Sequence, residues 1–111
     1  MSKDHDQLKA VPVRQRSAAR LAAIQIIYQS LITGNAGEKF ISEYLSYYAA
    51  EVSNSFRVKF LDKKHLMLLL NGVEVEQNNL DKIIGEALSE GWSVDRLALI
   101  ELAVLRCGAF E

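Results

Sequence analysis

From Val13 to Ile32 the chain consists mostly of residues that favour helix, and beyond Arg20 it is apolar on nearly every side of the helix axis. A helix that is apolar all round is usually buried among other helices. The segment Thr33-Gly34-Asn35 then supplies the residues that end a helix. This segment therefore predicts a fold in which one buried helix is packed among others.

The rest of the chain predicts further helices with short connections. A second helix is expected over Glu38–Ala50, where Phe40, Tyr44, Tyr47 and Tyr48 share one side. Residues 51–61 are ambiguous, since 52–55 resemble a loop and the alternation that follows has no second strand to pair with. Asp62 is expected to cap a third helix, and Asn78 or Asn79 a fourth that ends at Gly91. Ser93 is expected to cap a fifth helix, with Asp95 in its first turn.

Together these patterns predict an all-α bundle of about five helices. Residues 1–12 are polar and end at Pro12, so we expect them to form a flexible N-terminal arm. Residues 13–111 are expected to form a single helical domain, because 111 residues suffice for one small domain.

Composition excludes several classes of protein. One cysteine, Cys107, allows no internal disulfide, and no Cys/His set has the spacing of zinc ligands. No apolar run reaches the roughly 18 residues of a membrane span, and residues 1–13 do not resemble a secretory signal. No nucleophile–base set and no glycine-rich phosphate loop is found. We therefore expect a cytoplasmic, non-enzymatic protein without metal or cofactor.

The charge is unevenly distributed. The net charge is −1, yet residues 1–32 carry five basic and two acidic residues, a net of +3. Arg16 and Arg20 are four residues apart and share a helix face, and Arg14 lies at the same end. With the free N–H groups of the first turn they are suited to bind phosphate, although a solvated helix start is the simpler interpretation. Residues 57–65 hold a second basic cluster that extends this possibility.

Two further side chains are candidates for binding. Tyr28 lies in an aliphatic helix and is either a core residue or a stacking surface for an unpaired base. Glu101 interrupts the apolar stripe of Leu97, Ile100 and Val104. A carboxylate there is costly unless it is paired or at the surface, so Glu101 either pairs with a nearby Arg or Lys or accepts hydrogen bonds from a base.

Several motifs, in order and spacing, resemble the NusB family over roughly residues 14–111. The carriers are Arg16-Ser-Ala-Ala-Arg20-Leu-Ala-Ala-Ile-Gln25-Ile-Ile-Tyr28, Leu68-Leu-Leu-Asn-Gly72-Val73, Leu80-Asp81, Trp92-Ser-Val-Asp-Arg96-Leu97 and Ile100-Glu101-Leu-Ala-Val-Leu105-Arg106-Cys-Gly-Ala-Phe110-Glu111. The family continues with two more helices after this point. The resemblance therefore implies a C-terminally truncated member with an incomplete second subdomain and an open apolar face that favours marginal stability or a homodimer.

The resemblance also implies a function. It implies binding of boxA-type single-stranded RNA together with the ribosomal protein NusE, within the RNA polymerase antitermination complex on ribosomal RNA operons. The residues implied to contact RNA are Arg14, Arg16, Arg20, Tyr28 and Glu101. Two alternatives stay open: the non-catalytic N-terminal domain of an RsmB-type ribosomal RNA cytosine methyltransferase, and a helical module that binds only protein.

Overall fold

The computed structural model describes residues 10–34, 37–88 and 97–111, and every regular element in these ranges is a helix. The helices are α1 (Val11–Thr33), α2 (Glu38–Ser55), α3 (Lys63–Ala87) and α4 (Leu99–Phe110). The all-α prediction is confirmed. The described residues hold four helices, because two of the predicted helices form the single helix α3.

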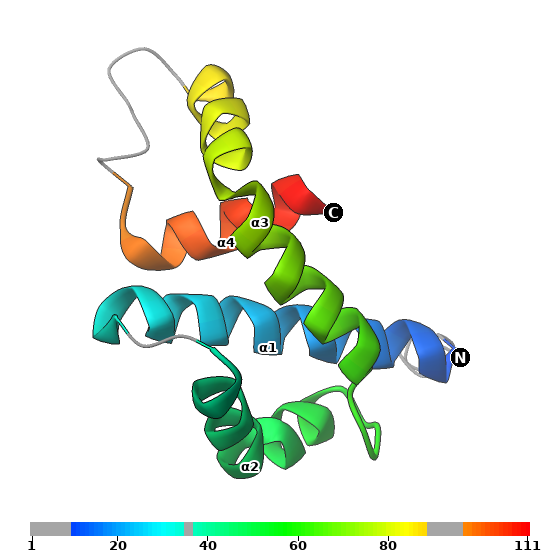
Figure 1. Cartoon of the computed structure of the whole chain (residues 1–111). Helices are drawn as coiled ribbons and strands as arrows, with labels where there is room; N and C mark the ends of the chain where they lie inside the picture. The colour runs from blue at the N-terminus through cyan, green and yellow to red at the C-terminus, as the bar shows by residue number, and fades with distance from the viewer. Residues whose placement is uncertain (1–9, 35–36, 89–96) are drawn as a thin grey trace.

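Helix α1 lies at the centre of the bundle (Figure 1). The other three helices each pack against it, and α3 also packs against α4. In Figure 1, α2 lies on one side of α1, α4 runs antiparallel to α1 on the other side, and α3 crosses α1. This arrangement explains why α1 is apolar nearly all round, because three neighbours bury three of its sides.

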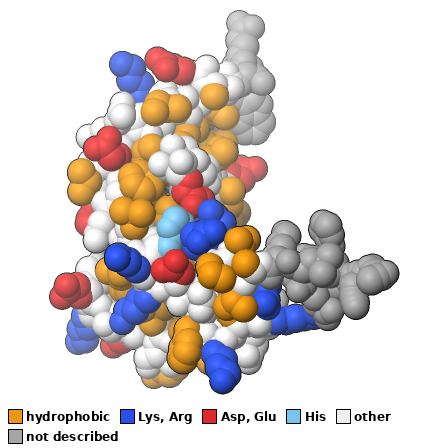
Figure 2. All heavy atoms as spheres, turned by 90° about the vertical axis from the view of Figure 1, so that its right-hand side faces the viewer, with side chains coloured by type: hydrophobic (Ala, Val, Ile, Leu, Met, Phe, Trp, Pro, Cys, Tyr) orange, Lys and Arg blue, Asp and Glu red, His pale blue; other side chains and the backbone are white. Residues whose placement is uncertain are grey.

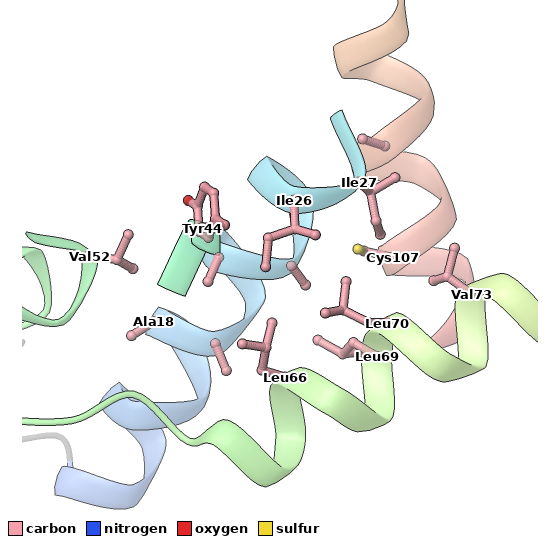
Figure 3. Close-up of a cluster of buried hydrophobic side chains, with 14 of the residues drawn as sticks. Ala18, Ile26, Ile27, Tyr44, Val52, Leu66, Leu69, Leu70, Val73 and Cys107 are labelled. Carbon is pink, nitrogen blue, oxygen red and sulfur yellow. The ribbon is translucent and has the colours of Figure 1, made fainter. Parts of the chain in front are cut away.

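The core is built on an alanine surface of α1. Ala18, Ala19, Ala22 and Ala23 have no exposed surface, and small side chains of this kind let helices approach closely. Leu66 and Leu69 of α3 pack fully buried into the same cluster, as Figure 3 shows around Ile26 and Ile27. On the far side of α1, Tyr44 and Val52 come from α2.

Helix α3 merges two helices that the sequence predicted separately. Asp62 caps it as expected, with a side-chain oxygen that accepts from the backbone N–H of His65 at 2.9 Å. The predicted break at Asn78 or Asn79 is wrong, because these exposed residues lie inside the helix. The buried stripe of Leu66, Leu69, Leu70 and Val73 continues in register to Leu80 and Ile84, and its burial outweighs the low helix propensity of asparagine.

Two other predicted boundaries were also wrong. Helix α2 continues beyond Ala50 to Ser55, since the hydroxyl of buried Ser53 donates to the Ala49 carbonyl at 2.7 Å and so meets its hydrogen-bonding need inside the helix. The helix expected to follow Ser93 is not helical at Leu97 and Ala98, and α4 begins at Leu99. The predicted stop at Gly91 and the cap at Ser93 with Asp95 lie outside the described residues.

The ends of α1 follow the sequence more closely. Pro12 lies in the first turn of the helix, where its missing N–H is not needed. Gly34 ends the helix in the left-handed conformation, with its N–H donating to the Ser30 carbonyl at 2.8 Å. Of the predicted arm, residues 1–9 lie outside the described residues, and Val11 and Pro12 belong to α1.

Candidate nucleic-acid interface

The loop between α2 and α3 is held against the first turns of α1. The guanidinium of Arg14 donates through Nη1 to the carbonyls of Arg57 at 2.8 Å and of Phe56 at 3.4 Å. The backbone N–H of Asp62 donates to the Gln15 carbonyl at 3.0 Å. These contacts place the first turn of α3 beside the first turns of α1, which brings the two basic clusters of the sequence together.

We call the resulting surface the basic end. Its members, which come from α1, the loop and the first turn of α3, are Arg14, Arg16, Arg20, Arg57, Lys59, Lys63 and Lys64. The four members from the loop and α3 are exposed, and neither α1 nor α3 has an acidic residue in its first turn. Figure 2 looks onto the side of the molecule where α1 begins and shows Lys and Arg side chains near a histidine, with Asp, Glu and apolar side chains among them.

Two helix N-termini add to the positive potential of this end. The first N–H groups of a helix lack partners within the helix, and the helix dipole places partial positive charge there. Because α1 and α3 both begin at the basic end, their dipoles act with the Lys and Arg charges. The Asp62 carboxylate caps α3 and offsets part of this potential. Such a surface attracts an anion with several phosphates.

The three predicted arginines of α1 differ in their surroundings. Arg14 is bound to the loop carbonyls, so it has a structural contact in addition to its charge. Arg20 donates through Nε to both carboxylate oxygens of Glu111, at 2.8 and 2.7 Å. Arg16 is half-buried and makes no side-chain hydrogen bond or ion pair with any residue in the described ranges.

Glu111 joins three helices at the edge of the basic end. Its carboxylate accepts from Arg20 of α1 and lies 3.0 Å from Nε2 of His65 on α3, while Glu111 itself directly follows α4. Burial raises the pKa of Glu111, but the hydrogen bonds and charges of Arg20 and His65 outweigh burial and lower that pKa below its ordinary value. A partly exposed ion pair of this kind contributes little to stability.

Tyr28 lies away from the basic end. It is eight residues beyond Arg20, about 12 Å along the helix, and lines a groove between α1 and α2. Tyr44 lines the same groove, and its hydroxyl donates to Oε1 of Gln25. Burial, with the nearby Tyr48 and Glu51, raises the pKa of Tyr44 to about 12. The predicted aromatic side of α2 therefore faces an open groove and only Tyr44 is buried.

Glu101 lies in the first turn of α4, at the end of that helix farther from Glu111. Its Oε1 accepts a hydrogen bond from the backbone N–H of Ala98 at 3.0 Å, so the carboxylate helps to cap the start of α4. The expected pairing with Arg or Lys is not what the structure shows. The structure therefore brings Arg14, Arg16 and Arg20 to one end and leaves Tyr28 and Glu101 apart from them.

The outer surface of α4 is apolar and open. Ile100 and Val104 are 43% and 45% exposed, and with Leu97 and Leu105 they line a shallow depression beside Glu101. This is the open apolar face expected from the sequence. Cys107 faces the opposite way into the core, where burial and the nearby Glu111 raise the pKa of its thiol to about 11.

Sequence reasoning missed the contacts that hold these surfaces in place. The ion pair between Arg106 and Asp81 links α4 to α3, and the contacts of Arg14 hold the loop. A charged residue inside the buried stripe of Leu102, Ala103 and Cys107 was the available signal for Arg106. Nothing in the local pattern marked the partner of Arg14, which is 43 residues away.

Within residues 10–34, 37–88 and 97–111, no group of three His, Cys, Asp or Glu side chains is arranged to hold a metal ion. None of the four described helices is both long and apolar enough to cross a membrane.

Comparison with known proteins identifies one family. The NusB family model matches residues 17–111. A transcription antitermination protein NusB from Rhizobium rhizogenes is 34% identical over 111 residues, which is all of this chain and 69% of the relative. The protein of the same name from Bradyrhizobium diazoefficiens is 36% identical over 97 residues, or 87% of this chain and 59% of the relative.

The matched relatives are longer than this chain. A relative from Sinorhizobium medicae, also named transcription antitermination protein NusB, is 34% identical over 99 residues, 89% of this chain and 62% of the relative. The chain therefore spans about two thirds of the length of these relatives or less. No solved structure matches the chain.

Proposed function

The chain belongs to the NusB family, and on that premise we propose that it is a non-enzymatic transcription antitermination factor. In this proposal it binds boxA-type single-stranded RNA together with the ribosomal protein NusE. It acts in the cytoplasm as part of the RNA polymerase antitermination complex. The antitermination role is supported by the relatives, which are named transcription antitermination protein NusB.

The observation that carries the RNA-binding part of the proposal is the basic end. It gathers seven Lys and Arg residues and two helix N-termini on a protein whose net charge is −1. Arg14 and Arg20 also make structural contacts, but such a concentration of positive charge on an otherwise acidic chain is suited to a polyanion. Phosphate contacts would supply most of the affinity and would fix the position of the strand.

Individual residues have different parts in this proposal. Arg16 meets a phosphate directly, since it has no competing partner in the described part of the chain. Arg20 exchanges the Glu111 carboxylate for a phosphate, and Arg14 adds its charge while it holds the loop. Tyr28 and Glu101 are proposed to contact the strand farther on. Because α1 and α4 are antiparallel, Tyr28 and Glu101 lie in the same direction along the helices from Arg20 and Glu111. Tyr28 lies on the α2 side of α1 and Glu101 on the α4 side.

The open outer surface of α4 supports a second interaction. We propose that Ile100, Val104 and Leu105 take part in association with another protein chain, a second copy of this one included. Apolar surfaces of this kind are commonly covered by a partner.

The experiment that tests the function measures binding of boxA-type RNA and of a scrambled RNA of equal length, each with and without NusE. The proposal predicts that the chain binds boxA-type RNA more tightly than the scrambled RNA, and that NusE increases this difference. Equal binding of the two RNAs in the presence of NusE would contradict a boxA function. Binding of NusE without any RNA binding would favour the protein-only module.

A further inference from the structure

The groove between α1 and α2 holds every tyrosine of the chain. The sequence has four tyrosines, and Tyr28, Tyr44, Tyr47 and Tyr48 all line this groove together with Phe40. On α2 the aromatic residues follow spacings of three and four, so they form one continuous side of the helix. The groove has a volume of about 610 Å³, which is in the range of ligand sites.

The rings are clustered and accessible. The ring centroids of Tyr44 and Tyr48 are 5.0 Å apart, and those of Tyr47 and Tyr48 are 6.4 Å apart, both with tilted planes. Tyr47 is 79% exposed and Tyr48 is 49% exposed. Burying a large aromatic side chain stabilises a protein because it removes apolar area from water. The isolated chain lacks this stabilisation at Tyr47 and Tyr48. These rings are therefore available to a ligand.

The charge of the groove selects the class of ligand. Glu43 and Glu51 line it on the same side of α2, and among the described residues no Lys or Arg lines it. On the α2 side of the groove these two carboxylates lie beside aromatic faces, where they attract a cation and disfavour a phosphate. Since the basic end has the opposite charge, the molecule presents two surfaces with different partners.

We propose that this groove binds an arginine side chain from a peptide segment of a partner protein. A guanidinium is planar, so it stacks on a tyrosine ring while its N–H groups donate to a carboxylate. The faces of Tyr47 and Tyr48 supply the stacking surface, and Glu43 and Glu51 accept the hydrogen bonds. Tyr44, which is fixed by its hydrogen bond to Gln25, forms the floor.

The location of the four tyrosines provides a direct test. Selective labelling of tyrosine rings with ¹³C makes only the groove visible by NMR, because no tyrosine lies elsewhere. The full chain is titrated with a blocked Gly-Arg-Gly-Arg-Gly peptide and with the same peptide carrying citrulline, the neutral isostere of arginine. The proposal predicts saturable shifts of the tyrosine signals with the arginine peptide and none with the citrulline peptide.

Matched variants distinguish peptide binding in the groove from attraction to the acidic surface as a whole. Glu43→Gln/Glu51→Gln removes both charges at exposed helix positions and should weaken peptide binding about tenfold. Glu74→Gln/Glu76→Gln removes two exposed charges of α3 outside the groove and should leave the affinity unchanged. Tyr47→Ala, at an exposed position, should weaken binding while the fold is retained.

Several results would overturn the proposal. Equal shifts with the citrulline peptide would show that charge is not recognised. Equal losses in the two glutamate pairs would show attraction to the whole acidic surface. Shifts of all four tyrosines with a single-stranded RNA, and none with the arginine peptide, would assign the groove to RNA. A shift of Tyr28 alone with RNA is compatible with the proposal, which rests on Tyr47, Tyr48 and the two glutamates.

Discussion

Arg106 and Asp81 form a two-pronged ion pair that joins α4 to α3. Nε of Arg106 donates to Oδ1 of Asp81 and Nη2 donates to Oδ2, each at 2.9 Å. Arg106 is only 6% exposed, so its charge has little access to water. The orientation of α4 across α1 and α3 therefore depends on one carboxylate that satisfies a buried guanidinium.

Asp81→Ala is expected to lower the free energy of unfolding by about 2 to 4 kcal/mol, because it leaves the Arg106 charge buried without a partner. Urea denaturation followed by circular dichroism measures this change. Glu74→Ala, at an exposed position of the same helix, is the control and should cost less than about 0.5 kcal/mol. Similar losses in both variants would show that the pair does not hold α4 in place.

Gly72→Ala and Gly108→Ala are expected to change stability in opposite directions. A Cβ at Gly72 would overlap the ring of Phe110, whereas a Cβ at Gly108 meets no atom within 4 Å. Overpacking should make Gly72→Ala destabilising by about 1 to 3 kcal/mol, and Gly108→Ala should stabilise by up to about 1 kcal/mol through helix propensity. Thermal melts compare the two, and a stabilising Gly72→Ala would contradict the packing of Phe110 against α3.

Glu111 is expected to make stability depend on pH in the acidic range. Its folded-state pKa is lowered from 4.5, so its contribution is present above that value and is lost as pH falls through the lower folded pKa. Glu111→Gln should therefore be less stable than the wild type at neutral pH. Urea midpoints of both proteins, followed across this range, should converge on acidification. A difference that stays constant with pH would contradict the ion pairs with Arg20 and His65.

Val104→Glu is expected to reduce self-association of the chain. The substitution places a charge on the open apolar surface of α4 without touching the core, because Val104 is exposed. Sedimentation velocity at increasing concentration should show larger species for the wild type than for the variant. Lys82→Glu, an exposed change on α3, is the control and should behave as the wild type. Monomeric wild type at all concentrations would contradict this prediction.

The fold class could be predicted because its signal is local. Helical spacing identified the stripe of Leu66, Leu69, Leu70 and Val73 in α3, and the residue type at Asp62 identified its cap. The same local reasoning failed at Asn78, which is a residue type common at helix caps but lies inside α3. Burial of Leu80 and Ile84 against other helices decides that the helix continues, and a local pattern does not contain this burial.

The sequence identified the charged residues of the candidate site better than it predicted how they are arranged in space. Charge counting identified the two basic clusters, but their meeting depends on Arg14 and the carbonyl of Arg57, which are far apart in sequence. The pairing of Arg20 with Glu111 and the groove around Tyr28 are likewise tertiary relationships. Glu101 interrupts an apolar stripe in the sequence, yet its carboxylate is exposed and accepts from the N–H of Ala98, a local cap that the stripe did not predict.

The most direct test of the account is the salt dependence of RNA binding by two matched double variants. Arg16→Ala/Lys63→Ala removes two charges from the basic end, and Lys39→Ala/Lys82→Ala removes two exposed lysines from elsewhere on α2 and α3. The affinity for boxA-type RNA is measured at several salt concentrations in the presence of NusE. We predict that the first variant binds more weakly and that its slope of log affinity against log salt is smaller by about 1.4, the value for two lost phosphate contacts with a single strand. The second variant should match the wild type. Equal slopes and affinities for all three proteins would contradict the assignment of RNA binding to the basic end.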